Sequence, residues 1–214
     1  MIFMNKKIDY SLYLVTNNKD KTEEEFLNII EEAAKGGITV LQIREKNLPL
    51  TEYLEIGKKV QDIAKKYNIP FIVDDNVAIA LDLKADGVHV GQSDLEASEV
   101  RKIIGPDMIL GVSAHTVEQA QKAEEDGADY IGSGAVFTSP TKLDATSITF
   151  DDLRNIADSV NIPVLVIGGV NENNIKELKD THIDGICVVS AIMESENPKL
   201  ASENLKIEFE KIKK

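Results

Sequence analysis

Eight short runs rich in β-branched residues alternate with longer segments of helical period, and this alternation constrains the fold more than any other feature. Such a pattern is typical of parallel strands joined by crossover helices. The runs predict strands at residues 12–16, 39–44, 70–74, 87–90, 108–113, 130–137, 163–168 and 185–190. Eight strand-helix units in 214 residues match an α/β fold, a single closed (β/α)8 TIM barrel. We expect one domain over residues 1–214, with an N-terminal arm at about 1–11.

The helices between the runs carry recognisable start and stop signals. Thr22 and Glu25 form a predicted capping box, after which apolar residues recur at helical spacing. Thr116 and Gln119 predict a second box, on a helix that ends at Gly127. A doubly wound open sheet is the competing architecture, but no Gly-x-Gly-x-x-Gly turn follows the first predicted strand.

Composition excludes several classes of protein. The chain is 43% hydrophobic and 29% charged, and no apolar run approaches the ~20 residues that span a bilayer. The N-terminus lacks the pattern of a signal peptide, so we expect a cytoplasmic protein with no membrane partner. A net charge of −13 argues against nucleic-acid binding, which needs a basic surface. The lone Cys187 lies in an apolar run, which favours a buried thiol over a nucleophile.

The second predicted strand points cations into the barrel mouth, where the chemistry of such barrels takes place. Gln42, Arg44 and Lys46 share one face by the period of two, and Leu41 and Ile43 face the helices. A buried cation needs a counter-charge. An ion pair with a carboxylate at residue 74 or 75 would supply it, but two cations and a glutamine together favour a bound anion.

Two neighbouring units supply carboxylates. Asp74 and Asp75 end the third predicted strand, and Asp94 follows the fourth. Magnesium usually takes one or two protein carboxylates and completes its shell with water and substrate phosphate, so Asp75 and Asp94 predict a Mg2+ site. The alternative for Asp94 is that it caps the N-terminus of a helix over residues 95–104.

The sixth, seventh and eighth units offer groups for a phosphate. Residues 138–142 form a hydroxyl-rich segment that ends in Lys142 and could donate hydrogen bonds to an anion. Gly169 and Ser190 follow the seventh and eighth strands, where barrels commonly bind phosphate. His89 reads as a core histidine with satisfied hydrogen bonds rather than a catalyst. Two anion pockets on opposite sides of the mouth suggest two small phosphorylated substrates.

Six short motifs occur in an order and spacing that resemble the thiamine-phosphate synthase family. They are 41–46 (LQIREK), 71–75 (FIVDD), 86–92 (DGVHVGQ), 111–115 (GVSAH), 141–142 (TK) and 167–169 (IGG). The resemblance runs from about residue 12 to residue 192. It implies a transferase that joins hydroxymethylpyrimidine diphosphate to a thiazole phosphate, yielding thiamine phosphate and pyrophosphate. It also implies a dissociative reaction in which pyrophosphate leaves before the thiazole nitrogen attacks.

The resemblance assigns roles to particular residues of this chain. Catalytic roles fall on Arg44, Ser113 and Lys142, and the pyrimidine diphosphate site would comprise Gln42, Arg44, Lys46, Asp74, Ser113 and Lys142. The thiazole phosphate site would comprise Ser139, Pro140, Thr141, Gly169, Val189 and Ser190, and Asp75 and Asp94 would bind Mg2+.

Two residues depart from the family pattern. This chain has Asp74 where the family has Asn, and Ser139 where the family has Thr. Two other functions stay open, a thiazole tautomerase-like paralogue and a non-catalytic barrel that binds a phosphorylated ligand. A tautomerase would not need the full diphosphate and magnesium set, so the synthase is favoured by retention of Lys46, Asp75, Asp94 and Lys142.

Overall fold

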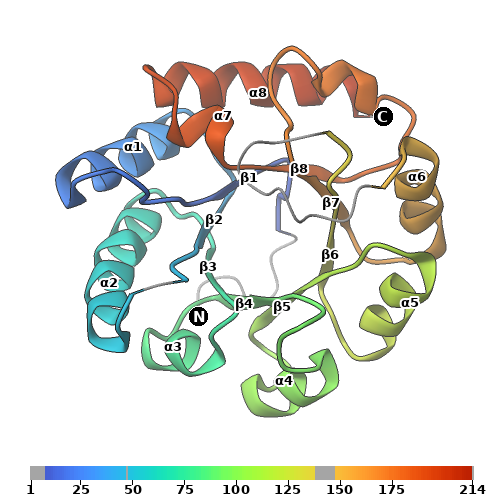
Figure 1. The fold of residues 1–214 in the computed structure, drawn as a ribbon, viewed down its shortest axis with the longest axis horizontal. Helices are drawn as coiled ribbons and strands as arrows, with labels where there is room; N and C mark the ends of the chain where they lie inside the picture. Colours follow the sequence, from blue (N-terminus) through green and yellow to red (C-terminus); the bar gives the residue numbers. More distant parts are fainter. Residues whose placement is uncertain (1–7, 47, 138–147, 214) are drawn as a thin grey trace.

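The computed structural model describes residues 8–46, 48–137 and 148–213. Eight parallel strands form one closed barrel in sequence order, and β8 pairs with β1 to complete the ring. The strands are β1 (Leu12–Val15), β2 (Val40–Ile43), β3 (Phe71–Asp74), β4 (Gly87–Val90), β5 (Ile109–Ser113), β6 (Tyr130–Ser133), β7 (Val164–Ile167) and β8 (Gly185–Val188). Figure 1 shows this ring with the helices outside it. The predicted (β/α)8 barrel is therefore confirmed.

The helices occupy the outer layer. They are α1 (Glu23–Lys35), α2 (Leu50–Lys66), α3 (Val77–Asp82), α4 (Ala97–Ile104), α5 (Val117–Glu125), α6 (Phe150–Ser159), α7 (Ser190–Met193) and α8 (Pro198–Ile212). A short 3-10 helix, η1 (Ile175–Leu178), lies between β7 and β8. Within the described part of the chain, no helix combines the length and the apolar character that crossing a membrane requires.

The two predicted capping boxes have different outcomes. At α1 both halves form, because the Thr22 side chain accepts from the Glu25 N–H and the Glu25 carboxylate accepts from the Thr22 N–H. At α5 the Thr116 hydroxyl accepts from the Gln119 N–H, as expected. The reciprocal bond was predicted wrongly, since the Gln119 side chain accepts from the N–H of His115 instead of that of Thr116.

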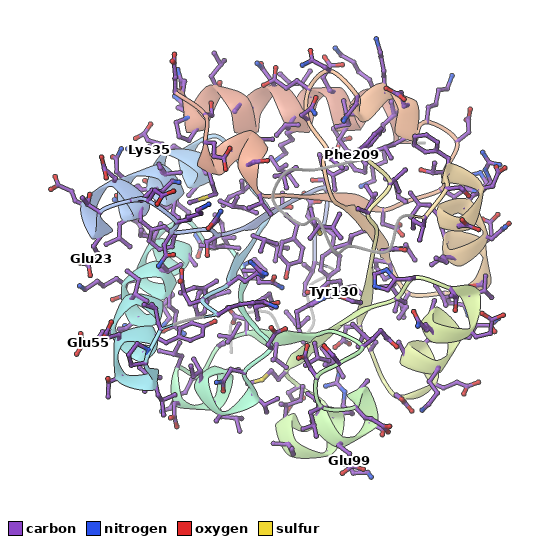
Figure 2. The ribbon with its side chains drawn as sticks, in the orientation of Figure 1. Glu23, Lys35, Glu55, Glu99, Tyr130 and Phe209 are labelled. Carbon is purple, nitrogen blue, oxygen red and sulfur yellow. The ribbon has the colours of Figure 1, made fainter. Side chains whose placement is uncertain are left out.

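Alternation along the strands separates two apolar layers. One layer packs between sheet and helices and includes Leu41 and Ile43, as the period of two predicts. The other fills the barrel interior and comprises Tyr10, Tyr13, Val15, Val40, Ile72, Ile109, Tyr130, Leu165 and Cys187. In Figure 2 Tyr130 lies within the ring of strands, whereas Glu55 and Glu99 lie on the outer helices. Burial raises the pKa of the Cys187 thiol, so this cysteine is an interior packing residue, as predicted.

The sixth strand is shorter than predicted. It ends at Ser133, whereas the apolar pattern extends to Phe137. The chain then passes close to the end of β7, because a Cβ on Gly134 would lie only 1.8 Å from the Ile167 carbonyl oxygen. Residues 135–137 therefore leave the sheet and lead toward Gly168 and Gly169, at the barrel mouth.

Candidate active site

Polar side chains gather where β2, β3, β4 and β5 end. Gln42 lies inside the barrel, and its amide nitrogen donates to the Tyr13 hydroxyl over 3.0 Å. Ser113 ends β5, at the register position that faces inward together with Ile109 and Gly111. In such barrels the carboxyl ends of the strands form the active-site face, so these residues mark the mouth.

Arg44 and Asp74 form an ion pair across the ends of β2 and β3. Arg44 Nε lies 3.4 Å from Asp74 Oδ2, and the Arg44 N–H donates to the Thr16 hydroxyl. Burial, and next the charge of Asp75, raise the pKa of Asp74 to about 7, although Arg44 and Lys46 oppose the rise. Burial thus favours the protonated form of Asp74 more than in an exposed aspartate.

Lys46 and Asp75 form the second pair, with Nζ 3.4 Å from Oδ2. The ion pairs that the sequence offered as the alternative to a bound anion are therefore present. The physical reason is that β2 and β3 are adjacent strands, so residues just beyond their ends lie within reach of one another. Asp75 has a φ of 59°, a left-handed conformation that is unusual for a residue other than glycine, and its N–H donates to the His89 carbonyl.

Asp94 belongs to the same group of carboxylates. Its Oδ2 accepts from the Gly91 N–H over 2.7 Å, and its carboxyl neighbours that of Asp75. Burial and the Asp75 carboxylate raise the pKa of Asp94, opposed by the Gly91 N–H. The alternative reading as a helix cap is wrong, because α4 begins only at Ala97 and its N-cap position is Glu96.

His89 is hydrogen-bonded through both ring nitrogens, as expected for a satisfied core histidine. Nδ1 lies 3.0 Å from the Tyr130 hydroxyl, and Nε2 lies 2.9 Å from the Ser113 hydroxyl. The Tyr130 hydroxyl is in turn 2.7 Å from that of Tyr13, which accepts from Gln42. A chain of hydrogen bonds therefore runs through the barrel from Gln42 to Ser113.

The opposite side of the mouth is formed by the ends of β7 and β8. Gly168 and Gly169 have φ values of 103° and 71°, and a Cβ on Gly169 would lie 2.9 Å from the Phe137 carbonyl oxygen. Ser190 begins the short helix α7, directly after Val189. All four of these residues after β7 and β8 are partly exposed, so their backbone borders the opening.

Four predicted site residues lie outside the described residues. They are Ser139, Pro140, Thr141 and Lys142, within the range 138–147.

Three residues of the site were missed by sequence reasoning. Tyr13 and Tyr130 connect Gln42 to His89, and the signal that could have found them is their inward register on β1 and β6. Glu45 is the third. Burial raises the pKa of its carboxyl to about 7, and Glu45 Oε1 is buried without a hydrogen-bond partner among the described residues.

These features define a (β/α)8-barrel enzyme with a charged mouth. Cations and carboxylates line one side of this mouth, and glycine-rich turns line the other. The thiamine monophosphate synthase family matches residues 12–192. The chain belongs to this family.

Individual relatives show the same likeness. The chain is 54% identical over 202 residues to a thiamine-phosphate synthase of Methanobrevibacter smithii, covering 94% of this chain and 96% of the relative. It is 51% identical over 201 residues to one of Clostridium tetani, covering 94% and 96%. Among solved structures, thiamine phosphate pyrophosphorylase from Pyrococcus furiosus matches with a TM-score of 0.87 and 40% identity, covering 96% of this chain and 98% of that one.

Proposed function

We propose that this protein condenses hydroxymethylpyrimidine diphosphate with a thiazole phosphate, yielding thiamine phosphate and pyrophosphate. The proposal rests on two ion pairs that lie together at the mouth of a barrel of this family. They are Arg44 with Asp74 and Lys46 with Asp75. A diphosphate needs cations, and a divalent metal needs carboxylates. The mouth offers both side by side.

The pyrimidine diphosphate would bind on the side of β2, β3 and β5. Arg44 and Lys46 are partly exposed and can exchange their carboxylate partners for phosphate oxygens when substrate and metal arrive. Gln42 and Ser113 lie deeper and would orient the ring and the scissile bond. Asp74 would adjoin this site, and Lys142, from sequence resemblance, would contact the diphosphate.

Asp75 and Asp94 would hold Mg2+. The Asp75 carboxylate is close enough to help raise the pKa of Asp94, and two such neighbouring acids suit a divalent cation. No cluster of three or more His, Cys, Asp or Glu side chains suited to a metal occurs among residues 8–46, 48–137 and 148–213. Two carboxylates agree with a magnesium ion whose other ligands are water and phosphate oxygens, and such an ion would neutralise leaving-group charge.

The thiazole phosphate would bind on the side of β7 and β8. Gly169, Val189 and Ser190 border that part of the mouth, where barrels commonly bind a phosphate on backbone N–H groups. Ser139, Pro140 and Thr141 would complete the site, by resemblance. The glycine at 169 suits such a role, because a side chain there would meet the Phe137 backbone.

The chemistry asks the protein for positioning and charge stabilisation rather than a nucleophile. Pyrophosphate would depart first, and the cations Arg44 and Lys46 would stabilise its charge as the carbon-oxygen bond breaks. The thiazole nitrogen would then attack the pyrimidine methylene carbon, with both rings held in the barrel mouth. Cys187 takes no part, because it is buried in the interior layer of the barrel.

The decisive assay combines purified protein, both phosphorylated substrates and Mg2+, and detects thiamine phosphate and pyrophosphate in equal amounts. Binding of both substrates without turnover would instead support the non-catalytic barrel. Conversion of a thiazole substrate without any pyrimidine diphosphate would support the tautomerase-like alternative.

A further inference from the structure

We infer that Tyr13, Tyr130 and His89 are positioning residues that fix the direction of the Ser113 hydroxyl proton, so that Ser113 donates into the barrel mouth. The chain of hydrogen bonds from Gln42 to Ser113 is the basis. The consequence for catalysis rests on the proposed function, whereas the proton positions do not depend on it.

The direction of the chain follows from counting protons. Burial raises the pKa of both Tyr13 and Tyr130 well above the ordinary value, so each phenol keeps one proton to donate. Gln42 donates to Tyr13, and Tyr13 then donates to Tyr130, which donates to His89 Nδ1. Nδ1 is therefore an acceptor, and the ring proton of His89 sits on Nε2.

The reverse direction leaves a proton without an acceptor. If His89 Nδ1–H donated to Tyr130 and Tyr130 donated to Tyr13, Tyr13 would accept two hydrogen bonds, one of them from Gln42. The proton of Tyr13 itself would then have no acceptor among the described residues, although this side chain is 1% exposed. A buried donor without a partner destabilises the folded state. The first direction has no such cost.

Two glycines make room for the chain. A Cβ on Gly111 would lie 2.2 Å from the Tyr130 hydroxyl oxygen and 2.5 Å from His89 Nδ1. A Cβ on Gly132 would lie 3.2 Å from His89 Cε1. Neighbouring strands β5 and β6 thus both lack a side chain where Tyr130 and His89 meet, which allows their hydrogen bond to form inside the barrel.

The consequence appears at Ser113. Because His89 Nε2–H donates to the Ser113 oxygen, the hydroxyl proton of Ser113 must go to another acceptor. Ser113 is partly exposed at the end of β5, so an anionic oxygen in the mouth can be that acceptor. The chain therefore presets a donor for the charge that develops on the departing diphosphate.

The first test reads the proton positions in the protein without substrates. Nitrogen-15 NMR of labelled histidine distinguishes a protonated ring nitrogen from an unprotonated one. We expect a neutral His89 with the proton on Nε2 in the wild type, and a shift toward the Nδ1-protonated form in Tyr130→Phe, which can no longer donate to Nδ1. A wild-type His89 that carries its proton on Nδ1 would overturn the inference, whatever the enzyme's activity.

The second test is a double-mutant cycle with Tyr130→Phe and Ser113→Ala. Tyr130→Phe should lower kcat about tenfold and leave the KM for the pyrimidine diphosphate within about twofold, since an oriented donor to a charged group is lost. In the Ser113→Ala background the same change should have no further effect on kcat, because Tyr130 acts through Ser113. Equal, additive losses in both backgrounds would assign Tyr130 a purely structural role and refute the inference.

Tyr10→Phe is the matched control. Tyr10 packs on the Tyr130 ring with centroids 5.0 Å apart and belongs to the same interior layer, yet its hydroxyl makes no hydrogen bond among the described residues. We expect Tyr10→Phe to retain the wild-type kcat and His89 tautomer. Circular-dichroism melts of all variants would check that each is folded. A wild type that forms no thiamine phosphate would contradict the proposed function, and the NMR result would still decide the proton positions.

Discussion

The Lys46 ammonium lies 3.4 Å from the Asp75 carboxylate, whose neighbour Asp94 has a pKa raised by burial and by Asp75. Lys46 is therefore paired with one of two neighbouring acids. A divalent cation bound as proposed above would add positive charge beside both carboxyl groups.

Asp75→Ala should abolish most of the activity and remove its dependence on magnesium. The carboxylate would help hold the ion that neutralises departing pyrophosphate, and we expect kcat/KM to fall about 100-fold or more. Product formation across a magnesium titration measures both effects. Asp107→Ala, at an exposed position before β5, is the control and should behave as wild type. Full turnover of wild type in excess chelator would contradict the prediction.

Asp74→Asn should make the metal-free protein more stable at pH 8 than the wild type. Burial raises the pKa of Asp74 from 3.8 to about 7, so the native state binds more protons than the unfolded state between these values. Stability from Asp74 is therefore present below about pH 4 and is lost as the pH rises toward 7. The asparagine removes this loss, which we expect to be on the order of 1–3 kcal/mol.

Thermal melts in chelator at pH 4.5 and pH 8 test this prediction. The stability gap between Asp74→Asn and wild type should open as the pH rises, whereas Asp107→Asn should track the wild type. A mutant that is less stable than wild type at pH 8 would show that the ion pair with Arg44, 3.4 Å away, outweighs the cost of burying the charge.

Gly169→Ala should weaken the use of the thiazole phosphate and lower stability. Gly169 has a φ of 71°, which strains the backbone of any other residue, and an added Cβ would lie 2.8 Å from Phe137 Cβ. Together we expect these effects to lower the free energy of unfolding by about 1–3 kcal/mol. Gly105→Ala is the matched control, since Gly105 has a φ of 73° and nothing within 4 Å of the added Cβ. We expect a raised KM for the thiazole phosphate only in Gly169→Ala. Identical kinetics in the two variants would remove Gly169 from the substrate site.

Lys142→Ala should slow the reaction at saturating substrates without lowering the melting temperature. The expectation comes from the sequence, where Lys142 ends a hydroxyl-rich segment, and from the family resemblance, which implies that this lysine contacts the diphosphate. Lys58→Ala, on the exposed part of α2, is the control for loss of one positive charge. An unchanged rate in Lys142→Ala would exclude this lysine from the reaction.

The fold prediction rested mainly on the periodic spacing of apolar residues along the sequence. The helical spacing after Thr22 and the inward register of Gln42 depend only on local geometry, 3.6 residues per helical turn and two per strand repeat. The sequence therefore determined the eight strands, the barrel and the face of β2 that points inward. The sequence pattern did not determine where each strand ends. β6 ends at Ser133, and the next residue, Gly134, lies where an added Cβ would be 1.8 Å from the carbonyl oxygen of Ile167, 33 positions away in the sequence.

Only the tertiary structure decided which side chains meet. The sequence placed Arg44, Asp74 and Ser113 at strand ends, but their partners depend on the register and tilt of neighbouring strands. The same holds for Tyr13 and Tyr130, whose strands lie on opposite parts of the ring and whose hydroxyls meet inside it over 2.7 Å. Barrel closure brings such residues together, and closure is a property of all eight strands rather than of any one segment.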